Sequence, residues 1–442
     1  MKETTTVAVV GAGIAGIAAA YFEARKGHKV YLIELSLRAG GLLKSDSHEF
    51  GTFDYGTHVA GDCGLPELDE FLYGGMTEDE YLFFNPGDSG NYYGGILSEI
   101  SPFVNTTVLS EHKSIRASLE LLKAKGNREA KNLEEMMIAR FGKLFYTEVM
   151  GEVVLKFMGK DPRELAKDAI YFFDMNRVLA FDAETTDRLK QIDNYDDALG
   201  YHYPAPGARK IYPRTGGIGA WIDFLMEKLQ KVGVEYLPAT KITSVHEHEG
   251  QIEELVLGNK IMAIDKLLWS IPPAFLARLI DSASSFPRPR FRKTGLYDFA
   301  FDKPLETKCF YLNVYDPKLH SARVTIYQNL AQEGPHYGCT VEVLAGDEFD
   351  FESKLELILD ELKTMGLVKD SHSCVYKGYR SIRAGFPVPD IQFLEQSGQM
   401  AKKLDEKLKN VTFIGRGYGR FFMKDILKHT YQMCARELIA LT

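Results

Sequence analysis

The segment Val7–Ser45 (VAVVGAGIAGIAAAYFEARKGHKVYLIELSLRAGGLLKS) decides the fold of this chain. Thr6–Val10 is a short β-branched run, which is typical of a buried parallel strand. Three glycines follow at GxGxxG spacing. Ile17–Gly27 is rich in helix formers and ends at a glycine that suits a C-cap. A second strand is predicted over His28–Glu34. This order of strand, glycine turn, helix and strand is the context in which GxGxxG binds a dinucleotide.

Each glycine of the turn has its own physical role. Gly11 allows the tight turn, Gly13 lets the backbone approach a pyrophosphate, and Gly16 lets the helix pack against the strand. The helix N-terminus offers free N–H groups and a partial positive charge to phosphates. Glu34 lies where an acid accepts hydrogen bonds from an adenosine ribose, and an acid there disfavours NADP. The motif by itself leaves NAD and FAD open.

Length and composition limit the class of protein. The 442 residues predict two or three domains, and the net charge of −8 argues against a nucleic-acid binder. The five cysteines are scattered without CxxC spacing, so we expect reduced thiols in a cytoplasmic protein. The sequence shows neither a signal peptide nor an apolar run long enough for a membrane span. Metal, hydrolase and P-loop motifs are also not found, so no metal ligands are predicted.

Two further motifs separate FAD from NAD. They are RAGG (Arg38–Gly41), directly after the second strand, and FDYGTH (Phe53–His58). With these residues the chain resembles the FAD-dependent group that includes amine oxidases, protoporphyrinogen oxidases, phytoene desaturases and UDP-galactopyranose mutases. The resemblance implies FAD as the cofactor, with Arg38 near its phosphates and Gly40, Gly41 and Leu42 beside its ring. Adjacent glycines after a strand also suit backbone that passes close to a flat ligand.

The resemblance continues along the chain. A YPRTGG segment (Tyr212–Gly217) precedes a helix, and in Thr240–Thr243 the resemblance places a backbone contact to adenine at Ile242. Val411–Ile414 is a predicted strand, followed by the turn Gly415-Arg416-Gly417 and a predicted helix over Lys424–Leu441. In the resembled group this helix points its N-terminus at the flavin. The motifs and the resemblance together predict a set of cofactor-binding residues: Gly11, Gly13, Ile14, Ala15, Gly16, Glu34, Leu35, Arg38, Gly40, Gly41, Leu42, Gly56, Thr57, His58, Ile242, Gly415, Arg416, Lys424 and Asp425.

These patterns predict an α/β fold of two interleaved domains. A Rossmann-like FAD-binding domain with a doubly wound sheet would comprise residues 1–60, 205–285 and 375–442. A substrate domain would comprise residues 61–204 and 286–374. Its first part is predicted to be mainly helical, with one amphipathic helix over Asn132–Met150, and its second part alternates like an antiparallel sheet. The active site should lie between the domains, at the carboxyl ends of the parallel strands.

His58, Arg416 and Arg420 are the candidate catalytic residues. In the mutases a glycine–residue–histidine places its histidine against the flavin, and Gly56-Thr57-His58 matches; a histidine there could tune flavin protonation near neutral pH. Arg416 and Arg420 could grip a substrate phosphate or the FAD. The mutases also carry Gly-Arg where this chain has Gly415-Arg416.

The mutase resemblance stops at the sugar-diphosphate tyrosines. Their positions read Gly385-Phe386-Pro387-Val388 and Arg420-Phe421-Phe422, so the hydroxyls are missing and a more apolar pocket is expected. The first hypothesis is therefore an FAD-dependent oxidoreductase that transfers hydride from a small-molecule substrate to flavin N5. The alternative is a non-redox flavoenzyme of the mutase type that acts on a nucleotide sugar. A non-catalytic flavoprotein is a third option, and the sequence leaves the oligomeric state open.

Overall fold

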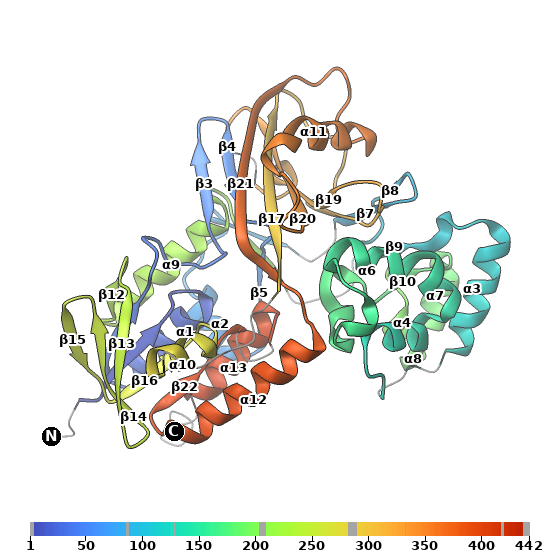
Figure 1. Cartoon of the computed structure of the whole chain (residues 1–442). Helices are drawn as coiled ribbons and strands as arrows, with labels where there is room; N and C mark the ends of the chain where they lie inside the picture. The colour runs from blue at the N-terminus through green and yellow to red at the C-terminus, as the bar shows by residue number, and fades with distance from the viewer. Residues whose placement is uncertain are drawn as a thin grey trace.

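The computed structural model describes residues 4–84, 88–124, 126, 129–202, 209–281, 290–331, 333–416 and 420–435. It has three lobes, which Figure 1 shows at the lower left, the top and the right. Within the described ranges, no helix combines the length and the apolar character that crossing a bilayer requires. The end of the predicted helix over Lys424–Leu441 and Gly417 of the preceding turn lie outside the described residues.

The first lobe is built on a five-stranded parallel sheet in the order β12-β2-β1-β16-β22. We call it the dinucleotide lobe. Its strands and helices are β1 (Thr6–Val10), α1 (Ile14–Arg25), β2 (Lys29–Ile33), β3 (Ser45–His48), β4 (Gly51–Asp54), β5 (Ala60–Gly61), α2 (Pro66–Tyr73), β6 (Tyr81–Phe84), β11 (Lys210–Pro213), α9 (Gly217–Lys231), β12 (Glu235–Leu237), β13 (Ile242–His248), β14 (Gln251–Leu257), β15 (Lys260–Ala263), β16 (Lys266–Trp269), α10 (Pro273–Ile280), α12 (Ile391–Lys407), β22 (Val411–Phe413) and α13 (Met423–Ala435).

Alternation along the parallel strands assigns side chains to the two faces of this sheet. Val7 and Val9 of β1 pack toward α1, α2, α9 and α13, whereas Ala8 and Val10 pack toward the β13–β15 meander, α10 and α12. Burial on both faces explains why β1 is apolar throughout rather than alternating. The Rossmann-like α/β fold predicted from the sequence is thus present.

The second lobe is a seven-stranded sheet in the order β21-β17-β20-β19-β18-β7-β8. Its elements are β7 (Ser89–Tyr93), β8 (Ile96–Ser98), β17 (Phe291–Phe301), β18 (Tyr311–Val314), β19 (Ser321–Ile326), β20 (Tyr337–Ala345), α11 (Leu355–Thr364) and β21 (Cys374–Pro387). All neighbouring strands are antiparallel except β18 and β7, which pair in parallel. The segment predicted as mainly helical, residues 61–204, therefore also supplies α2 and β6 to the dinucleotide lobe and β7 and β8 to this sheet.

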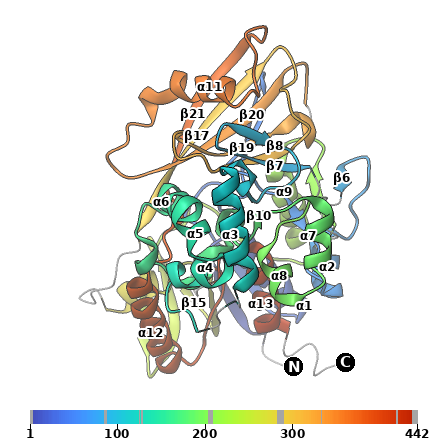
Figure 2. The ribbon, with the colours of Figure 1, turned by 90° about the vertical axis from the view of Figure 1, so that its right-hand side faces the viewer.

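The third lobe is helical and lies in front of the dinucleotide lobe in Figure 2. It contains β9 (Val104–Asn105), α3 (Glu111–Lys123), α4 (Leu133–Phe141), α5 (Lys143–Phe145), a π-helix (Tyr146–Met150), α6 (Gly151–Met158), 3₁₀ helices (Pro162–Glu164, Lys167–Asp174), β10 (Val178–Leu179), α7 (Ala183–Leu189) and α8 (Asp193–Ala198). The predicted helix over Asn132–Met150 is interrupted at Gly142. Its φ of 88° ends α4, because a left-handed residue cannot continue a right-handed helix.

Candidate functional site

The three motif glycines have different surroundings. A Cβ on Gly16 would lie 1.8 Å from the carbonyl oxygen of Gly11, and a Cβ on Gly11 would lie 2.4 Å from Oγ of Ser270. The chain's own packing therefore requires glycine at both positions. A Cβ on Gly13 would meet nothing within 4 Å, and its φ of −75° suits any residue. The packing of the described residues does not require glycine at position 13, and the space beside it fits a bound group.

The N-terminus of α1 faces the same space. Gly13 is its N-cap, no side chain caps the first turn, and that turn holds no acid. Ile14 and Ala15 begin the helix, so their N–H groups belong to the set that has no intrahelical acceptor. Together with the helix dipole they form a site for an anion such as a diphosphate.

Hydrogen bonds hold the Glu34 side chain in place at the end of β2. Its Oε2 accepts the N–H of Ala12 at 2.8 Å, and its Oε1 accepts the N–H and the hydroxyl of Ser36 at 2.8 and 2.7 Å. These bonds orient the carboxylate beside the glycine turn and leave Oε2, which accepts only one of them, capacity for a ribose hydroxyl. Leu35, predicted to bind the cofactor, has an exposed side chain.

The RAGG loop folds back onto the glycine turn. The N–H of Gly40 donates to the carbonyl of Ala12 at 2.7 Å, and a Cβ on Gly41 would lie 3.5 Å from Cα of Gly13. The structure thus brings together the GxGxxG turn and the RAGG loop, which are separated in the sequence by α1 and β2. Leu42 follows partly buried, and the exposed Arg38 lies 3.9 Å from Asp46.

The predicted adenine contact lies near the same end of β2. Glu34 donates its N–H to Leu237, and Thr240 donates its N–H to the carbonyl of Glu34. Ile242 begins β13 two residues later and packs partly buried against the core on that face. Ile242 thus lies near the Glu34 end of the sheet, and its contact to adenine stays a prediction.

A second group of polar residues meets the Gly56–His58 loop at the seven-stranded sheet. Thr57 donates its N–H to Oε1 of Glu342 at 2.9 Å, and a Cβ on Gly56 (φ 110°) would lie 3.4 Å from that carboxylate. Arg323 donates from Nε and Nη2 to the two oxygens of Glu342 at 2.8 and 3.0 Å. The two residues are register partners on β19 and β20. This bidentate pair anchors the loop that carries His58.

His58 is neutral at physiological pH in this setting. Burial, Arg323 and Arg416 lower its pKa to about 4, against an opposing effect of Glu342. In the protein without a ligand, His58 therefore does not titrate near pH 7, although its sequence context predicts a histidine that changes protonation near neutral pH. Burial opposes the ionisation of Glu342, but Arg323 holds its pKa below the ordinary value.

Arg416 is exposed to solvent and lies close enough to His58 to lower the pKa of that histidine. Gly415 precedes it with a φ of 82°, and a Cβ there would lie 2.6 Å from the carbonyl of Ser270. Glycine is thus required where β22 turns beside β16. His58 and Arg416, which are far apart in sequence, therefore lie within electrostatic reach of each other.

The remaining predicted residues lie around α13, which packs on α1 through the core of the dinucleotide lobe. Arg420 is partly exposed just before the helix, and Lys424 and Asp425 are exposed in its first turn. Burial and the charge of Lys424 lower the pKa of Lys210. The structure shows no contact that assigns Arg420, Lys424 or Asp425 to a ligand.

Sequence reasoning missed Arg323, Glu342 and Asp174. Asp174 ends a 3₁₀ helix of the helical lobe, and its Oδ2 accepts from Asn313 at 2.8 Å and from Tyr311 at 3.2 Å. A signal was available for the first two: each is a charged residue within an otherwise apolar strand, in SARVTI and in TVEVLA. No comparable signal marks Asp174, because its position depends on the packing of two lobes.

A buried hydrogen-bond network stands behind the FDYGTH loop. Asp54 accepts from Ser45 at 2.6 Å, from Tyr212 at 2.7 Å and from the N–H of Ile218 at 3.1 Å. Burial raises the pKa of Asp54 to about 6, although these bonds oppose the rise. Asp54 and Ser45 thereby cap α9 from outside, so the N-terminus of this helix is not available to a ligand.

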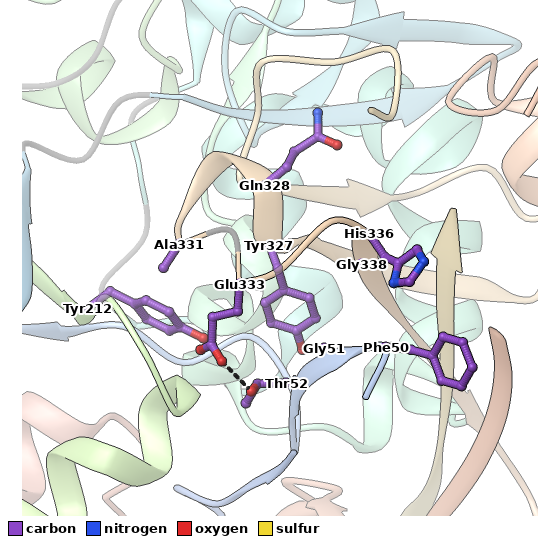
Figure 3. A pocket seen from close by; sticks show the side chains of 10 residues that line it. All are labelled: Phe50, Gly51, Thr52, Tyr212, Tyr327, Gln328, Ala331, Glu333, His336 and Gly338. Carbon is purple, nitrogen blue, oxygen red and sulfur yellow. Dashed lines mark hydrogen bonds between the residues drawn. The ribbon is translucent and has the colours of Figure 1, made fainter. Parts of the chain in front are cut away.

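A cavity adjoins this network rather than the glycine turn (Figure 3). Its volume is about 20 Å³, and Tyr212, Tyr327 and Glu333 are among the residues that line it. Glu333 accepts from Thr52 at 2.8 Å across the cavity wall. A cavity of this volume can hold a water molecule and is far too small for a substrate.

Comparisons with known proteins agree with this architecture. Residues 9–72 match the family model of the NAD(P)-binding Rossmann-like domain. No curated protein sequence matches the chain significantly.

Solved structures match over nearly the whole chain. Reduced UDP-galactopyranose mutase superposes with a TM-score of 0.77 at 18% identity, over 99% of this chain and 96% of that one. A protein from Exiguobacterium sp. 255-15, provisionally assigned as a protoporphyrinogen oxidase, gives 0.70 at 16% identity, over 100% and 99%. Putrescine oxidase bound to putrescine gives 0.62 at 13% identity, over 99% of both chains. The resemblance inferred from the motifs is confirmed at the level of the fold.

Proposed function

We propose that this protein is an FAD-dependent oxidoreductase that acts on a small-molecule substrate. The observation that carries the proposal is the open face of Gly13 at the uncapped N-terminus of α1, with Gly41 folded against it. Packing requires glycine at positions 11 and 16 but not at 13, so the open space beside Gly13 supports a bound dinucleotide. When bound, FAD supplies the hydride acceptor.

Different residues of the chain would bind different parts of this cofactor. The N–H groups at the start of α1 would bind the diphosphate, and Glu34 would accept from the ribose hydroxyls. The Gly56–His58 loop and Arg416 would face the reacting end. His58 would enter that site neutral, with one ring nitrogen that donates a hydrogen bond and one that accepts, and Arg416 would contribute the positive charge.

The mutase-type reaction is the second candidate. The superposition on UDP-galactopyranose mutase and the approach of Arg416 to His58 favour it. Phe386, Phe421 and Phe422 oppose it, because they pack around Phe172 as bare rings and offer no hydroxyl to a diphosphate. The oxidoreductase is therefore preferred.

The visible absorption spectrum of the purified protein tests the cofactor. We expect a flavin spectrum, and heat denaturation should release a compound that chromatography identifies as FAD. A colourless protein that also fails to take up added FAD would overturn the proposal. With FAD present, a substrate that bleaches the flavin without oxygen supports the oxidoreductase. Turnover of a nucleotide sugar only after chemical reduction, with no net bleaching, would replace it by the mutase.

A further inference from the structure

Five phenylalanine rings from three distant segments meet beside the polar residues of the site. Phe172 lies 5.0 Å from Phe386, 4.9 Å from Phe421 and 5.6 Å from Phe422, measured between ring centroids, and Phe173 lies 4.8 Å from Phe386. We call these five residues the phenylalanine cluster. Phe172 is buried, Phe173, Phe386 and Phe421 are partly buried, and Phe422 is 42% exposed. The cluster thus has a buried centre and a face open to a ligand.

The cluster continues directly into a strained backbone segment. Phe173 and Asp174 have φ angles of 52° and 53°, and both are non-glycine residues in the left-handed region. Such residues cost about 1–3 kcal/mol each and persist only where the surroundings hold them. Here Tyr315 donates to the carbonyl of Phe173 at 2.7 Å, and Asn313 and Tyr311 hold the Asp174 carboxylate.

The Asp174 carboxylate keeps one oxygen available. Its two hydrogen bonds within the described residues both end at Oδ2, so Oδ1 can accept from a ligand. The residue is partly exposed, and among the described residues it has no ion-pair partner. Asp174 is therefore an acceptor that Asn313 and Tyr311 hold in place at the edge of an apolar surface.

Phe173 connects the phenylalanine cluster to the residues near His58. The guanidinium carbon of Arg323 lies 5.8 Å from the centroid of its ring, and Arg323 is already neutralised by Glu342. Arg323 also acts on the pKa of His58. Arg323 is thus the residue at which the candidate site around His58 adjoins the phenylalanine cluster.

We propose that the substrate is an apolar small molecule with a single hydrogen-bond-donating head, which Asp174 accepts while the phenylalanine cluster packs against the body. This inference rests on the proposed function and names the substrate class of the same site. Both alcohols and amines carry such a hydrogen-bond-donating head group. A carboxylate head has no hydrogen to donate and would bring a second negative charge to a place where burial already raises the pKa of Asp174. A sugar diphosphate would find bare rings where it needs donors.

Binding to the FAD-loaded protein tests this assignment with probes that share one body. The probes are 4-phenylbutanol, 4-phenylbutylamine, 4-phenylbutyrate and UDP, each titrated without oxygen and followed by the change in the flavin spectrum. We expect the alcohol or the amine to bind at least tenfold more tightly than the carboxylate and UDP. Whichever of the two binds more tightly identifies the head.

Two variants with matched controls locate the interaction. Asp174→Asn keeps the shape and tolerates the left-handed backbone, and it should weaken binding of the preferred probe about tenfold. Asp168→Asn, exposed on the same 3₁₀ helix, should leave binding unchanged. Phe422→Ala should weaken binding about fivefold, whereas Phe291→Ala, 37% exposed at the start of β17, should not.

The outcomes separate the two proposals. A protein that binds no FAD overturns the proposed function and this inference with it. A protein that binds FAD but prefers the carboxylate or UDP, binds none of the probes, or responds to neither Asp174→Asn nor Phe422→Ala, overturns this inference alone.

Discussion

The backbone N–H of Thr57 lies 2.9 Å from Oε1 of Glu342 and donates a hydrogen bond to it. Thr57 belongs to the loop of the dinucleotide lobe that carries His58, and Glu342 belongs to β20 of the seven-stranded sheet. The bond joins two lobes at the residue beside the candidate catalytic histidine. Arg323 completes the arrangement through its bidentate pair with Glu342.

Glu342→Gln tests how much this arrangement depends on charge. The amide oxygen can still accept from Thr57, but Arg323 loses its counter-charge in a buried place. The Glu342 side chain is only 8% exposed. Breaking a buried pair by removing one partner costs about 3–5 kcal/mol, so urea unfolding should show a loss of about 3 kcal/mol.

The control for Glu342→Gln is Glu184→Gln, whose partner Arg188 and whose own side chain are 79% and 76% exposed. Its cost should stay below about 0.5 kcal/mol. The double variant Arg323→Met with Glu342→Gln should recover part of the loss, because no buried charge remains unpaired. Equal costs for the buried and the exposed pair would contradict this interpretation.

Gly13→Ala separates ligand binding from folding. A Cβ at this position meets no atom of the chain, so the apo protein should unfold within about 1 kcal/mol of wild type. The methyl group would, however, occupy the space beside the diphosphate, and FAD affinity should fall at least tenfold. Fluorescence titration of the apo protein with FAD measures it.

Two other glycines serve as references for Gly13→Ala. Gly398→Ala, also with open space around its Cβ, should leave FAD affinity unchanged. Gly16→Ala should prevent folding, because its Cβ would overlap the carbonyl of Gly11. Full FAD affinity in the Gly13→Ala protein would show that the glycine turn does not hold the cofactor.

His58 predicts a pH dependence of apo stability. Its pKa is lowered to about 4 in the folded protein, from an ordinary value of 6.5, so unfolding takes up a proton between these values. The stability it contributes is present above pH 6.5 and is lost as the pH falls toward 4. The size should be on the order of 2 kcal/mol, since the side chain is partly exposed.

Urea unfolding of wild type and His58→Gln at several pH values measures this effect. The advantage of wild type over the variant should shrink as the pH falls from 7 to 4.5. His248→Gln, exposed in the β13–β14 hairpin, controls for the loss of a histidine in general. Parallel stability curves for wild type and His58→Gln would mean that His58 is not desolvated.

Asp54 predicts a pH dependence of stability opposite in sign to that of His58. Its pKa is raised to about 6 from 3.8, so the folded protein retains a proton that the unfolded chain releases. This contribution is complete below pH 3.8 and is lost as the pH rises through 6. Asp54→Asn imitates the protonated side chain, and it should gain about 3 kcal/mol relative to wild type between pH 4 and pH 7. A difference that is independent of pH in the same unfolding experiment would indicate that Asp54 is ionised throughout.

The geometry of the glycine turn and of the acid beside it could be predicted from the sequence because its interactions are local. Gly11, Gly16 and Glu34 act within one strand–helix–strand unit, where spacing alone sets the geometry. The substrate end could not be predicted in the same way. Asp174 and Phe386 lie more than 200 residues apart, and only the packing of three lobes brings Phe173 against Phe386.

The sequence by itself therefore determined the Rossmann-like turn, the acid that follows it and the apolar strands of the parallel sheet, since hydrophobic periodicity and glycine spacing act over short distances. Tertiary structure alone decided that Glu342 would hold the His58 loop, that β7 and β8 would join the seven-stranded sheet through a parallel pair, and that Asn313 and Tyr311 would hold Asp174 next to the phenylalanine cluster. These contacts depend on which distant segments pack against each other in the folded chain. The burial of their side chains, rather than a local sequence pattern, determines that packing.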